Sequence, residues 1–371
     1  MDILRVQASS ERKTFIELPY SIYRHDPLWV PPLRSEVRAQ FNPQTNPFLE
    51  HVEYDLFLLK EDDAVIGRIA AFIDQTAVTF WGEPIGMYGY FECIDDEAAS
   101  TMLLETAAEW LRSRGMKAMR GPWSFVSEEW GLVVEGFSPP PCIMAPYNPP
   151  YYDKLMSTFG LEKVKDLLCY YISAAEGYEI PERILKLTDR VAERYGVTVR
   201  PVNMKNYEDE AQIILDLSNR SIINNWGYTP VSKAEAAAMA RDLKQILQPN
   251  GALIAEDSTG QPVGFALALP DINVLLKGLN GRMLPFGWIK LLMGIPRLHN
   301  YRMFGLGVVP EYHGLGIDSL LYRALYEALF TQDIWMEINY VLEDNAPMNN
   351  AIRKLNAKPL RRYRIYQMPL A

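Results

Sequence analysis

The stretch from Met303 to Leu329 constrains the fold most, because an apolar run there passes through two glycines into a segment with helical spacing. The run predicts a strand, and the spacing of Ile317, Leu321 and Leu325 predicts a helix with one buried face. Amides in the first turn of a helix have no internal partner, and glycine lets the main chain approach a ligand closely. The stretch therefore indicates either an anion site, as for a phosphate, or simply a tight turn between strand and helix.

The turn itself, from Val308 to Asp318, resembles the acyl-CoA loop of the GNAT superfamily of N-acyltransferases, Gln/Arg-x-x-Gly-x-Gly/Ala after a Val-x-Pro strand end. Gly316 matches that pattern, His313 stands where Gln or Arg is usual, and Asp318 replaces the final small residue. The carboxylate of Asp318 either competes for the donors that would hold a pyrophosphate or stabilises the helix start by about 0.3–1 kcal/mol. The resemblance implies that acetyl-CoA or another acyl-CoA is bound here by Val308, Val309, His313, Gly314, Leu315, Gly316, Ile317 and Asp318.

A second partial match begins at Asn345, where GNAT domains often read Asn-x-x-Ala-x-x-x-Tyr-x-x-x-Gly-Phe. Asn345 matches and, by the resemblance, is a further cofactor-binding residue. Ile352 replaces the Tyr that protonates the departing thiolate in many members, and Asn356-Ala357 replaces Gly-Phe. If this chain is an enzyme, it needs another proton donor.

Two domains are expected from the length of 371 residues, with a boundary in the small and polar segment 173–180. The order of strands and helices on both sides of that segment is similar to the GNAT plan. We therefore expect an α/β (α+β) chain of two tandem GNAT-like domains, residues 1–175 and 176–371, each a mixed, mostly antiparallel twisted sheet flanked by helices. The first has no Gly-x-Gly turn and is interpreted as a degenerate copy without a cofactor.

The formal net charge of −9 argues against nucleic acid as a partner, because phosphate contacts need a basic face. The three cysteines and four histidines have no metal-ligand spacing, so no metal site is expected. No secretion signal is visible after Met1, and the cytoplasm is the expected compartment. A local basic cluster is either a solvated strand edge or a grip on a ligand phosphate; it comprises Lys354, Lys358, Arg361, Arg362 and Arg364.

The segment 271–300 extends the chain beyond a minimal domain and is rich in large apolar residues. It is too broken by Gly and Pro to span a bilayer, which needs about 20 apolar residues. Three roles remain: packing on the other domain, walling an acyl or acceptor pocket, or lying on a membrane surface through 283–296. Packing ranks first, and membrane contact ranks last.

A polar and aromatic turn separates two expected helices in the second half and contains Asn225, Trp226 and Tyr228. In the GNAT plan the corresponding loop often covers the acceptor, so these residues are the candidate substrate-binding group. The alternative is a well-packed interhelix turn in which Asn225 acts as a cap.

The chemistry implied by the resemblance is direct attack of an amine on a thioester, without a covalent enzyme intermediate. Glu337 is the first candidate base, with water relayed by Tyr340 as the alternative, and Tyr340 or Tyr312 would protonate the thiolate. Backbone donors near Val308 and Val309 would hold the thioester carbonyl. The acceptor would be the amine of a small molecule or a peptide.

Three functions remain open at this point. The first is an acyl-CoA-dependent N-acyltransferase that works from the second domain. The second is a catalytically silent acyl-CoA-binding or regulatory module, indicated by Asp318 and Ile352. The third is a long-chain acyl or aminoacyl transferase, since tandem GNAT-like proteins of those kinds share the two-domain plan.

Overall fold

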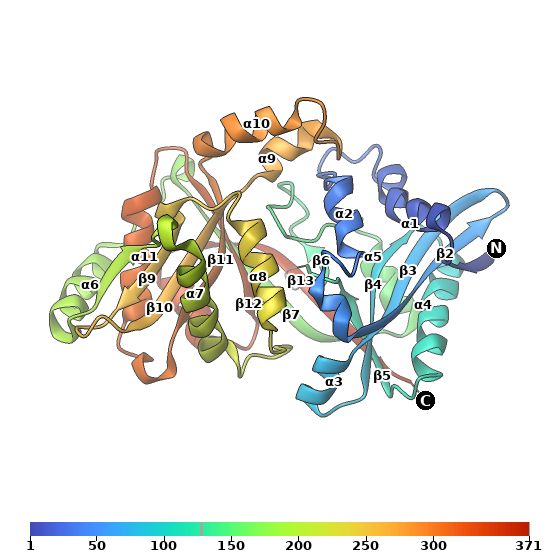
Figure 1. The fold of residues 1–371 in the computed structure, drawn as a ribbon, viewed down its shortest axis with the longest axis horizontal. Helices are drawn as coiled ribbons and strands as arrows, with labels where there is room; N and C mark the ends of the chain where they lie inside the picture. The colour runs from blue at the N-terminus through green and yellow to red at the C-terminus, as the bar shows by residue number, and fades with distance from the viewer. Residues whose placement is uncertain (127–128, 371) are drawn as a thin grey trace. The chain divides into compact units, whose positions relative to one another are not determined.

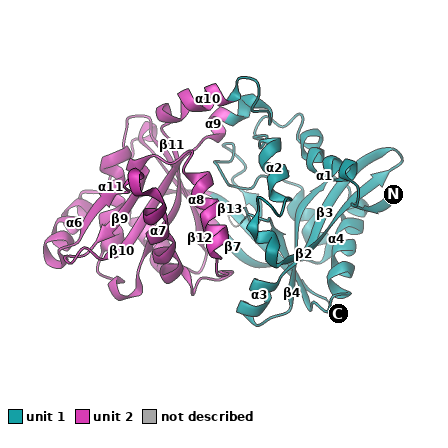
Figure 2. Ribbon diagram, viewed as in Figure 1, with its two compact units in different colours: residues 1–167, 276–287, 361–371 teal, residues 168–275, 288–360 magenta. Residues whose placement is uncertain are grey.

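The computed structural model describes residues 1–126 and 129–370 and divides into two compact units (Figure 2). Unit 1 comprises residues 1–167, 276–287 and 361–371, and unit 2 comprises residues 168–275 and 288–360. The chain therefore changes unit inside two strands, β7 (Glu162–Ser173) and β13 (Lys358–Pro369). The domain boundary expected at residue 175 remains a prediction.

Unit 1 is a sheet in the order β1-β2-β3-β4-β5-β13, with β6 paired to β13. Neighbouring strands are antiparallel except β4 and β5, which are parallel. The further strands are β1 (Asp2–Arg5), β2 (Val52–Glu61), β3 (Ala64–Asp74), β4 (Ile85–Cys93), β5 (Ala118–Trp123) and β6 (Leu132–Glu135). The helices are α1 (Ser9–Ile22), α2 (Arg34–Gln40), α3 (Gln75–Trp81), α4 (Glu97–Arg112) and α5 (Tyr152–Phe159).

Strand β3 is buried on both faces, which explains its nearly continuous apolar sequence. Ile69 and Ala71 belong to the core under α4 and α5, whereas Ala70 and Phe72 belong to the core under α1 and α2. Because successive side chains of a strand point to opposite faces, one strand serves both cores. The sheet of unit 1 thus lies between two layers of helices (Figure 1).

Unit 2 is built on the order β12-β11-β10-β9-β8, with the second part of β7 beside β12. The pairs β8/β9, β9/β10 and β10/β11 are antiparallel, and β11/β12 is parallel. The strands are β8 (Thr198–Pro201), β9 (Ala252–Glu256), β10 (Pro262–Pro270), β11 (Asn300–Val308) and β12 (Trp335–Leu342). The helices are α6 (Glu182–Tyr195), α7 (Tyr207–Ile222), α8 (Lys233–Leu243), α9 (Asn273–Leu276), α10 (Gly287–Gly294), α11 (Ile317–Leu329) and α12 (Ala346–Lys354).

The two faces of the unit 2 sheet are covered by different helices. Gly307 of β11 faces α7, since a Cβ there would lie 2.7 Å from Ser221 Oγ. Leu306 packs on the other face against the cluster of Ile184 from α6 and Tyr322 from α11. Both units therefore have the expected mixed and mostly antiparallel sheet between helices, and the expected fold class is confirmed.

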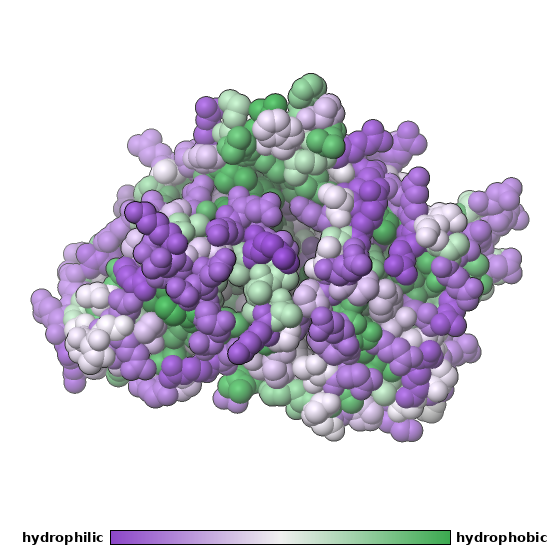
Figure 3. Space-filling view, in the orientation of Figure 1, coloured by the Kyte–Doolittle hydropathy of each residue, from purple (hydrophilic) through white to green (hydrophobic). Residues whose placement is uncertain are grey.

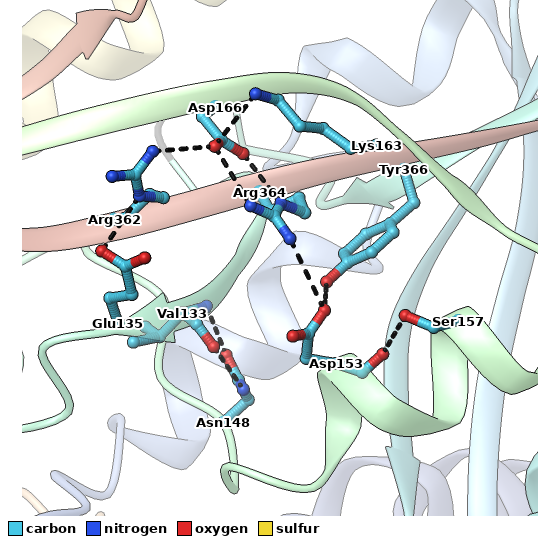
Figure 4. A network of polar contacts seen from close by, with 10 residues as sticks. All are labelled: Val133, Glu135, Asn148, Asp153, Ser157, Lys163, Asp166, Arg362, Arg364 and Tyr366. Carbon is cyan, nitrogen blue, oxygen red and sulfur yellow. Dashed lines mark hydrogen bonds and ion pairs between the residues drawn. The ribbon is translucent and has the colours of Figure 1, made fainter.

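Four residues of the basic cluster near the C-terminus, Lys358, Arg361, Arg362 and Arg364, have polar partners within the described structure. In unit 1, Arg362 and Arg364 of β13 both reach Asp166 of β7, with Arg364 Nε 2.9 Å from Asp166 Oδ1 (Figure 4). Arg361 is buried and donates to the carbonyl oxygen of Gly136 at 2.7 Å, because its strand is interior. The interpretation of Arg361 as part of a solvated edge is therefore wrong.

Candidate functional site

A fork between two parallel strands is the central feature of unit 2. The pairing of β11 with β12 covers Asn300–Met303 and Trp335–Ile338 and ends there, although β11 continues to Val308 and β12 to Leu342. Phe304 is an extra residue in β11, because Leu267 pairs with Gly305 and Ala268 pairs with Met303. A bulge of this kind bends its strand and re-aims the residues beyond it. The two strands therefore separate towards their C-terminal ends.

The alternation of backbone groups shows which amides of β11 point into the fork. The Val309 amide donates to the carbonyl oxygen of Val263 at 2.9 Å, so it is already used in pairing. Since successive N–H groups of a strand point to opposite edges, the amides of Leu306 and Val308 point towards the β12 side. Of the two expected carbonyl-binding positions, Val308 is the one with a suitably directed donor.

The glycine turn joins β11 to α11 with two residues in the left-handed region, Gly314 with φ 75° and Gly316 with φ 85°. A Cβ at Gly314 would meet no heavy atom within 4 Å, so the surface of the turn is open there. Gly316 caps α11 without a side-chain hydrogen bond, and the first amide that bonds back to it is that of Ser319 at 3.0 Å. The earlier amides of the turn are the donors that an anion would use.

His313 makes a hydrogen bond within the glycine turn. Its Nε2 lies 2.8 Å from the carbonyl oxygen of Val308, to which it donates, so the ring ties the turn to the end of β11. Two residues before His313, the carboxylate of Glu311 forms an ion pair with Arg220 of α7 at 3.2 Å. Two residues after it, the Leu315 amide donates to the carbonyl oxygen of Tyr312. The turn is thus a fixed structure built from its own residues and from α7.

Asp318 lies in the first turn of α11 and is the part of the loop that fits a pyrophosphate least well. Burial raises the pKa of its carboxyl group, while bonds from the amides of Ser319 and Asp318 and the charges of Lys354 and His313 act in the opposite direction. The carboxylate therefore occupies the Asp318 amide, one of the donors that a bound phosphate would need. Lys354 is the nearby cation that could offset this charge or contact a ligand phosphate directly.

Glu337 and Arg302 are register partners on β12 and β11, and both are 2% exposed. Met336 and Ile338 line a cavity on the α11 side, so the intervening Glu337 faces the α7 side. Cys169 of β7 lies 3.8 Å from the Glu337 carboxylate. The carboxylate is thus at the root of the fork, beside a cation and largely shielded from water.

Tyr340 and Tyr312 are the two expected proton donors, and the structure gives them different surroundings. The ring of Tyr340 lies 5.0 Å from the guanidinium of Arg302, which brings it to the same group as Glu337. Tyr312 instead donates to Asp257 at 2.9 Å, and this bond raises the pKa of the Tyr312 hydroxyl. Tyr312 is therefore engaged in the β9–β10 turn, and Tyr340 is the better placed of the two.

The candidate acceptor segment follows directly from the end of α7, which lies over Gly307 near the mouth of the fork. Asn225 accepts from the Tyr228 amide through its carbonyl oxygen at 3.1 Å, and Tyr228 donates its hydroxyl to Asn219 at 3.0 Å. The half-buried Trp226 lies between them in the chain. Both earlier interpretations survive, since the segment is an ordered turn and also sits at the α7 end of the fork.

Asn345 caps α12 by accepting from the Met348 amide at 3.1 Å. Ile352, at the position of the usual acidic Tyr, is completely buried. A ligand role for Asn345 remains a prediction, and position 352 is part of the core.

An apolar cavity of about 40 Å³ lies behind the fork on the α11 side. Met303 and Ile338, the last register pair before the strands separate, both contribute to its wall. The other lining residues are Ile172, Tyr178, Ile180, Tyr322, Leu325, Tyr326, Phe330, Ile334, Met336 and Leu355. The surroundings of the fork on this face are therefore hydrocarbon and aromatic.

The chain is similar to two bacterial proteins over nearly its whole length. The bacterial ceramide synthase of Caulobacter vibrioides is 32% identical over 381 residues, which cover 100% of this chain and 98% of that protein. Protein YghO of Escherichia coli (strain K12) is 34% identical over 366 residues, which cover 96% of this chain and 93% of that protein. No family model matches the sequence.

Solved GNAT structures share the fold, and two of them are compared with this chain. A tandem GNAT protein from the clavulanic acid biosynthesis pathway superposes with a TM-score of 0.57 at 12% identity and covers 100% of this chain and 98% of its own. A probable N-acyltransferase from Enterococcus faecalis V583 superposes with a TM-score of 0.53 at 10% identity, and the match covers 100% of this chain and 72% of that one. This chain belongs to the same family as these two bacterial proteins and has the fold of the GNAT structures. The expectation of an enzyme, a transferase of acyl groups, is confirmed.

Unit 1 of this GNAT-fold protein differs from unit 2 at the corresponding strand–helix junction. Between β4 and α4 the chain reads Ile94-Asp95-Asp96-Glu97, and the side chain of Asp96 caps α4 by accepting from the Ala99 amide at 2.7 Å. A self-capped helix start with several carboxylates repels an anionic ligand. The interpretation of the first copy as one without a cofactor rests on this contrast and remains a prediction.

Sequence reasoning missed Arg302, which the GNAT fold brings beside Glu337. An arginine inside an otherwise apolar strand was a usable signal, because charged residues are seldom buried unless paired. Among the described residues there is no group of three or more His, Cys, Asp or Glu arranged to hold a metal ion. Within residues 1–126 and 129–370, every helix is too short or too polar to cross a bilayer.

Proposed function

We propose that unit 2 transfers a long-chain acyl group from a CoA thioester to the primary amine of a lipid, such as a sphingoid base. The fork between β11 and β12 carries this proposal, because it joins the glycine turn of α11 to the buried Glu337. The relative named bacterial ceramide synthase supports the choice of acceptor, since a ceramide is an N-acylated sphingoid base. The preference for a long acyl chain over an acetyl group rests on the same relative, because the apolar cavity behind Met303 and Ile338, about 40 Å³, is much smaller than such a chain.

The protein would act chiefly by positioning the reactants. Amides of the glycine turn would hold the donor phosphates, and the Val308 amide would donate to the thioester carbonyl oxygen as negative charge develops there. The amine nitrogen forms a bond to the carbonyl carbon while the carbon–sulfur bond breaks. Because Glu337 is in register with Arg302, six residues before Val308 on β11, the proton of the nitrogen reaches it through water, and the hydroxyl of Tyr340 gives a proton to the sulfur.

The experiment is an end-point and kinetic assay of the full chain with sphinganine and either palmitoyl-CoA or acetyl-CoA, read by mass spectrometry of the amide and by thiol release. We expect the amide with palmitoyl-CoA and a much slower reaction with acetyl-CoA. Glu337→Gln should lower kcat by about 100-fold or more with a smaller change in KM. Glu92→Gln is the matched control, because Glu92 is also a largely buried carboxylate beside an arginine of the next strand.

A second candidate, a silent acyl-CoA-binding module, is favoured by the Asp318 carboxylate on the first-turn amides and by the buried Ile352. Binding of palmitoyl-CoA without any amide or thiol release, for every amine tested, would select it. Equal rates for the Glu337→Gln and Glu92→Gln variants would instead remove Glu337 from the proposed mechanism.

A further inference from the structure

Helix α10 of unit 2 has its apolar side turned outward. Gly294 faces inward, since a Cβ there would lie 2.8 Å from the Leu275 side chain. Trp288, Leu292 and Met293 are 51%, 68% and 56% exposed. A surface helix normally buries its large apolar residues, so this orientation is the reverse of the usual one. Figure 3 shows hydrophobic surface where Figure 1 draws α10.

Leu284 and Phe286, which precede α10 and belong to unit 1, are also exposed, by 77% and 72%. We call Trp288, Leu292 and Met293 of unit 2 the apolar face. They lie within six residues of one helix, so the helix itself keeps them together. Isolated exposed apolar residues are ordinary, whereas a gathered set marks an interaction site.

The helix is held firmly in this orientation. Lys290 Nζ donates to the carbonyl oxygen of Leu275 at 2.7 Å, and Gln248 Nε2 donates to that of Ile295 at 3.0 Å. Both contacts lie within unit 2 and tie the middle of α10 and the residue after its C-terminal end to the body of the unit. The exposure of the apolar face is thus built into the fold.

The charge of this segment identifies the kind of partner. From residue 272 to 298 the sequence has no Asp or Glu, and its charged residues are Lys277, Arg282, Lys290 and Arg297, in a protein of formal net charge −9. Exposed apolar side chains among basic ones suit the headgroup region of an anionic bilayer, where apolar groups enter and basic groups meet lipid charge. A second copy of this chain is less well matched, because in a symmetric contact it would bring the same basic residues against those of the first copy.

We propose that the apolar face and its basic residues dock this protein on the surface of an anionic lipid bilayer. Docking goes beyond the proposed function and does not depend on it, since it requires neither donor nor acceptor. It would bring a catalytic unit to an amine that resides in a membrane. Attachment would be peripheral and reversible, with a strength that falls as salt screens the basic residues.

The test is sedimentation of the full chain with vesicles of phosphatidylglycerol and phosphatidylcholine in equal parts, compared with phosphatidylcholine alone. We expect binding to the anionic vesicles that weakens at high salt. Leu292→Glu should reduce the partition coefficient about tenfold or more, because it removes apolar area and adds a repelled charge. Leu187→Glu is the matched control, since Leu187 is an exposed leucine of α6, 42% exposed, outside the apolar face.

Equal partitioning of the Leu292→Glu and Leu187→Glu variants would overturn the proposal, as would no binding to either vesicle. A dimer in light scattering that Leu292→Glu dissociates, in place of vesicle binding, would assign the face to a second copy. Equal binding to both vesicles would overturn the role of the basic residues. A separate acyl-transfer assay with soluble donor and acceptor distinguishes failure of membrane docking from failure of the proposed function. Leu292→Glu should leave the acyl-transfer rate in that assay unchanged.

Discussion

Arg68 and Glu92 of unit 1 are register partners on the antiparallel strands β3 and β4, whereas Arg302 and Glu337 of unit 2 are register partners on the parallel strands β11 and β12. In unit 1 the Arg68 Nη2 lies 3.5 Å from Glu92 Oε1, and the hydroxyls of Tyr23 and Tyr152 both donate to Glu92 Oε2 at 2.8 Å. Both carboxylate oxygens of Glu92 thus have partners within unit 1.

This arrangement predicts a purely structural role for Glu92. Glu92→Gln should lower the free energy of unfolding by about 3 kcal/mol, because it leaves the buried Arg68 cation without a carboxylate. Urea unfolding measures the loss. Acyl transfer per folded molecule should not change, and a large drop in kcat at unchanged fold would show that unit 1 takes part in the reaction.

Replacing Gly314 and, as a control, Gly260 separates the effect of backbone strain on stability from an effect on CoA binding. Gly314→Ala should cost about 1 kcal/mol of stability, because alanine is disfavoured at φ 75° even with open space around it. Gly260→Ala, at φ 82° and in similarly open space in the β9–β10 turn, should cost the same. Calorimetric titration with CoA should show weaker binding only for Gly314→Ala. Equal affinities would argue against the glycine turn as the phosphate site.

Asp318→Asn should bind CoA about tenfold more tightly, because it removes a negative charge from the amides that would hold the pyrophosphate. The carboxyl group has a raised pKa in the folded protein, so the stability it contributes is present below the unfolded-state pKa and is lost as pH rises through the folded one. The variant should lose this pH dependence, which thermal unfolding from acid to neutral pH would detect.

The matched change for Asp318→Asn is Asp96→Asn at the start of α4. Asp96→Asn should leave CoA affinity unchanged and alter stability only slightly, because asparagine is also a good helix cap. An increase in affinity of the same size in both variants would mean that net charge, and not the loop of α11, determines binding.

Asp166 should give the opposite pH dependence. Burial alone would raise the pKa of this carboxyl group, but hydrogen bonds from Arg364, Arg362 and Lys163 outweigh burial and lower the pKa. Its contribution is therefore present above the unfolded-state pKa and is lost as pH falls through the lower folded value. Asp166→Asn should cost about 3–5 kcal/mol near neutral pH and less in acid, as measured by urea unfolding.

Lys163→Ala is the control for this network. Lys163 is 39% exposed in its side chain, so its removal should cost about 1 kcal/mol or less. A loss as large as that of Asp166→Asn would show that the lysine, and not the arginine pair, neutralises the buried carboxylate.

Much of the fold could be predicted from local patterns. The bounds of β3 and β4 follow directly from apolar runs ended by turn residues, and α11 follows from its one-sided spacing. The short helices α2 and α3 were not predicted, since seven residues carry too few periods for a clear pattern. Local patterns record what a segment forms and leave open which sheet it joins.

The site divides in the same way. The glycine turn and Asp318 are readable in the sequence because their chemistry is local. The pairing of Arg302 with Glu337, the use of the Val309 amide and the engagement of Tyr312 by Asp257 depend on register between distant strands. The residues that flank these positions in the sequence do not predict any of the three contacts.

The exchange of strands makes each unit depend on both halves of the chain. Residues 168–173, encoded with the first half, belong to unit 2, and residues 361–371, encoded at the end of the second half, belong to unit 1. Neither half of the chain therefore contains a complete sheet, so removing either half would leave the sheet of the remaining unit without its last strand and with an unpaired edge.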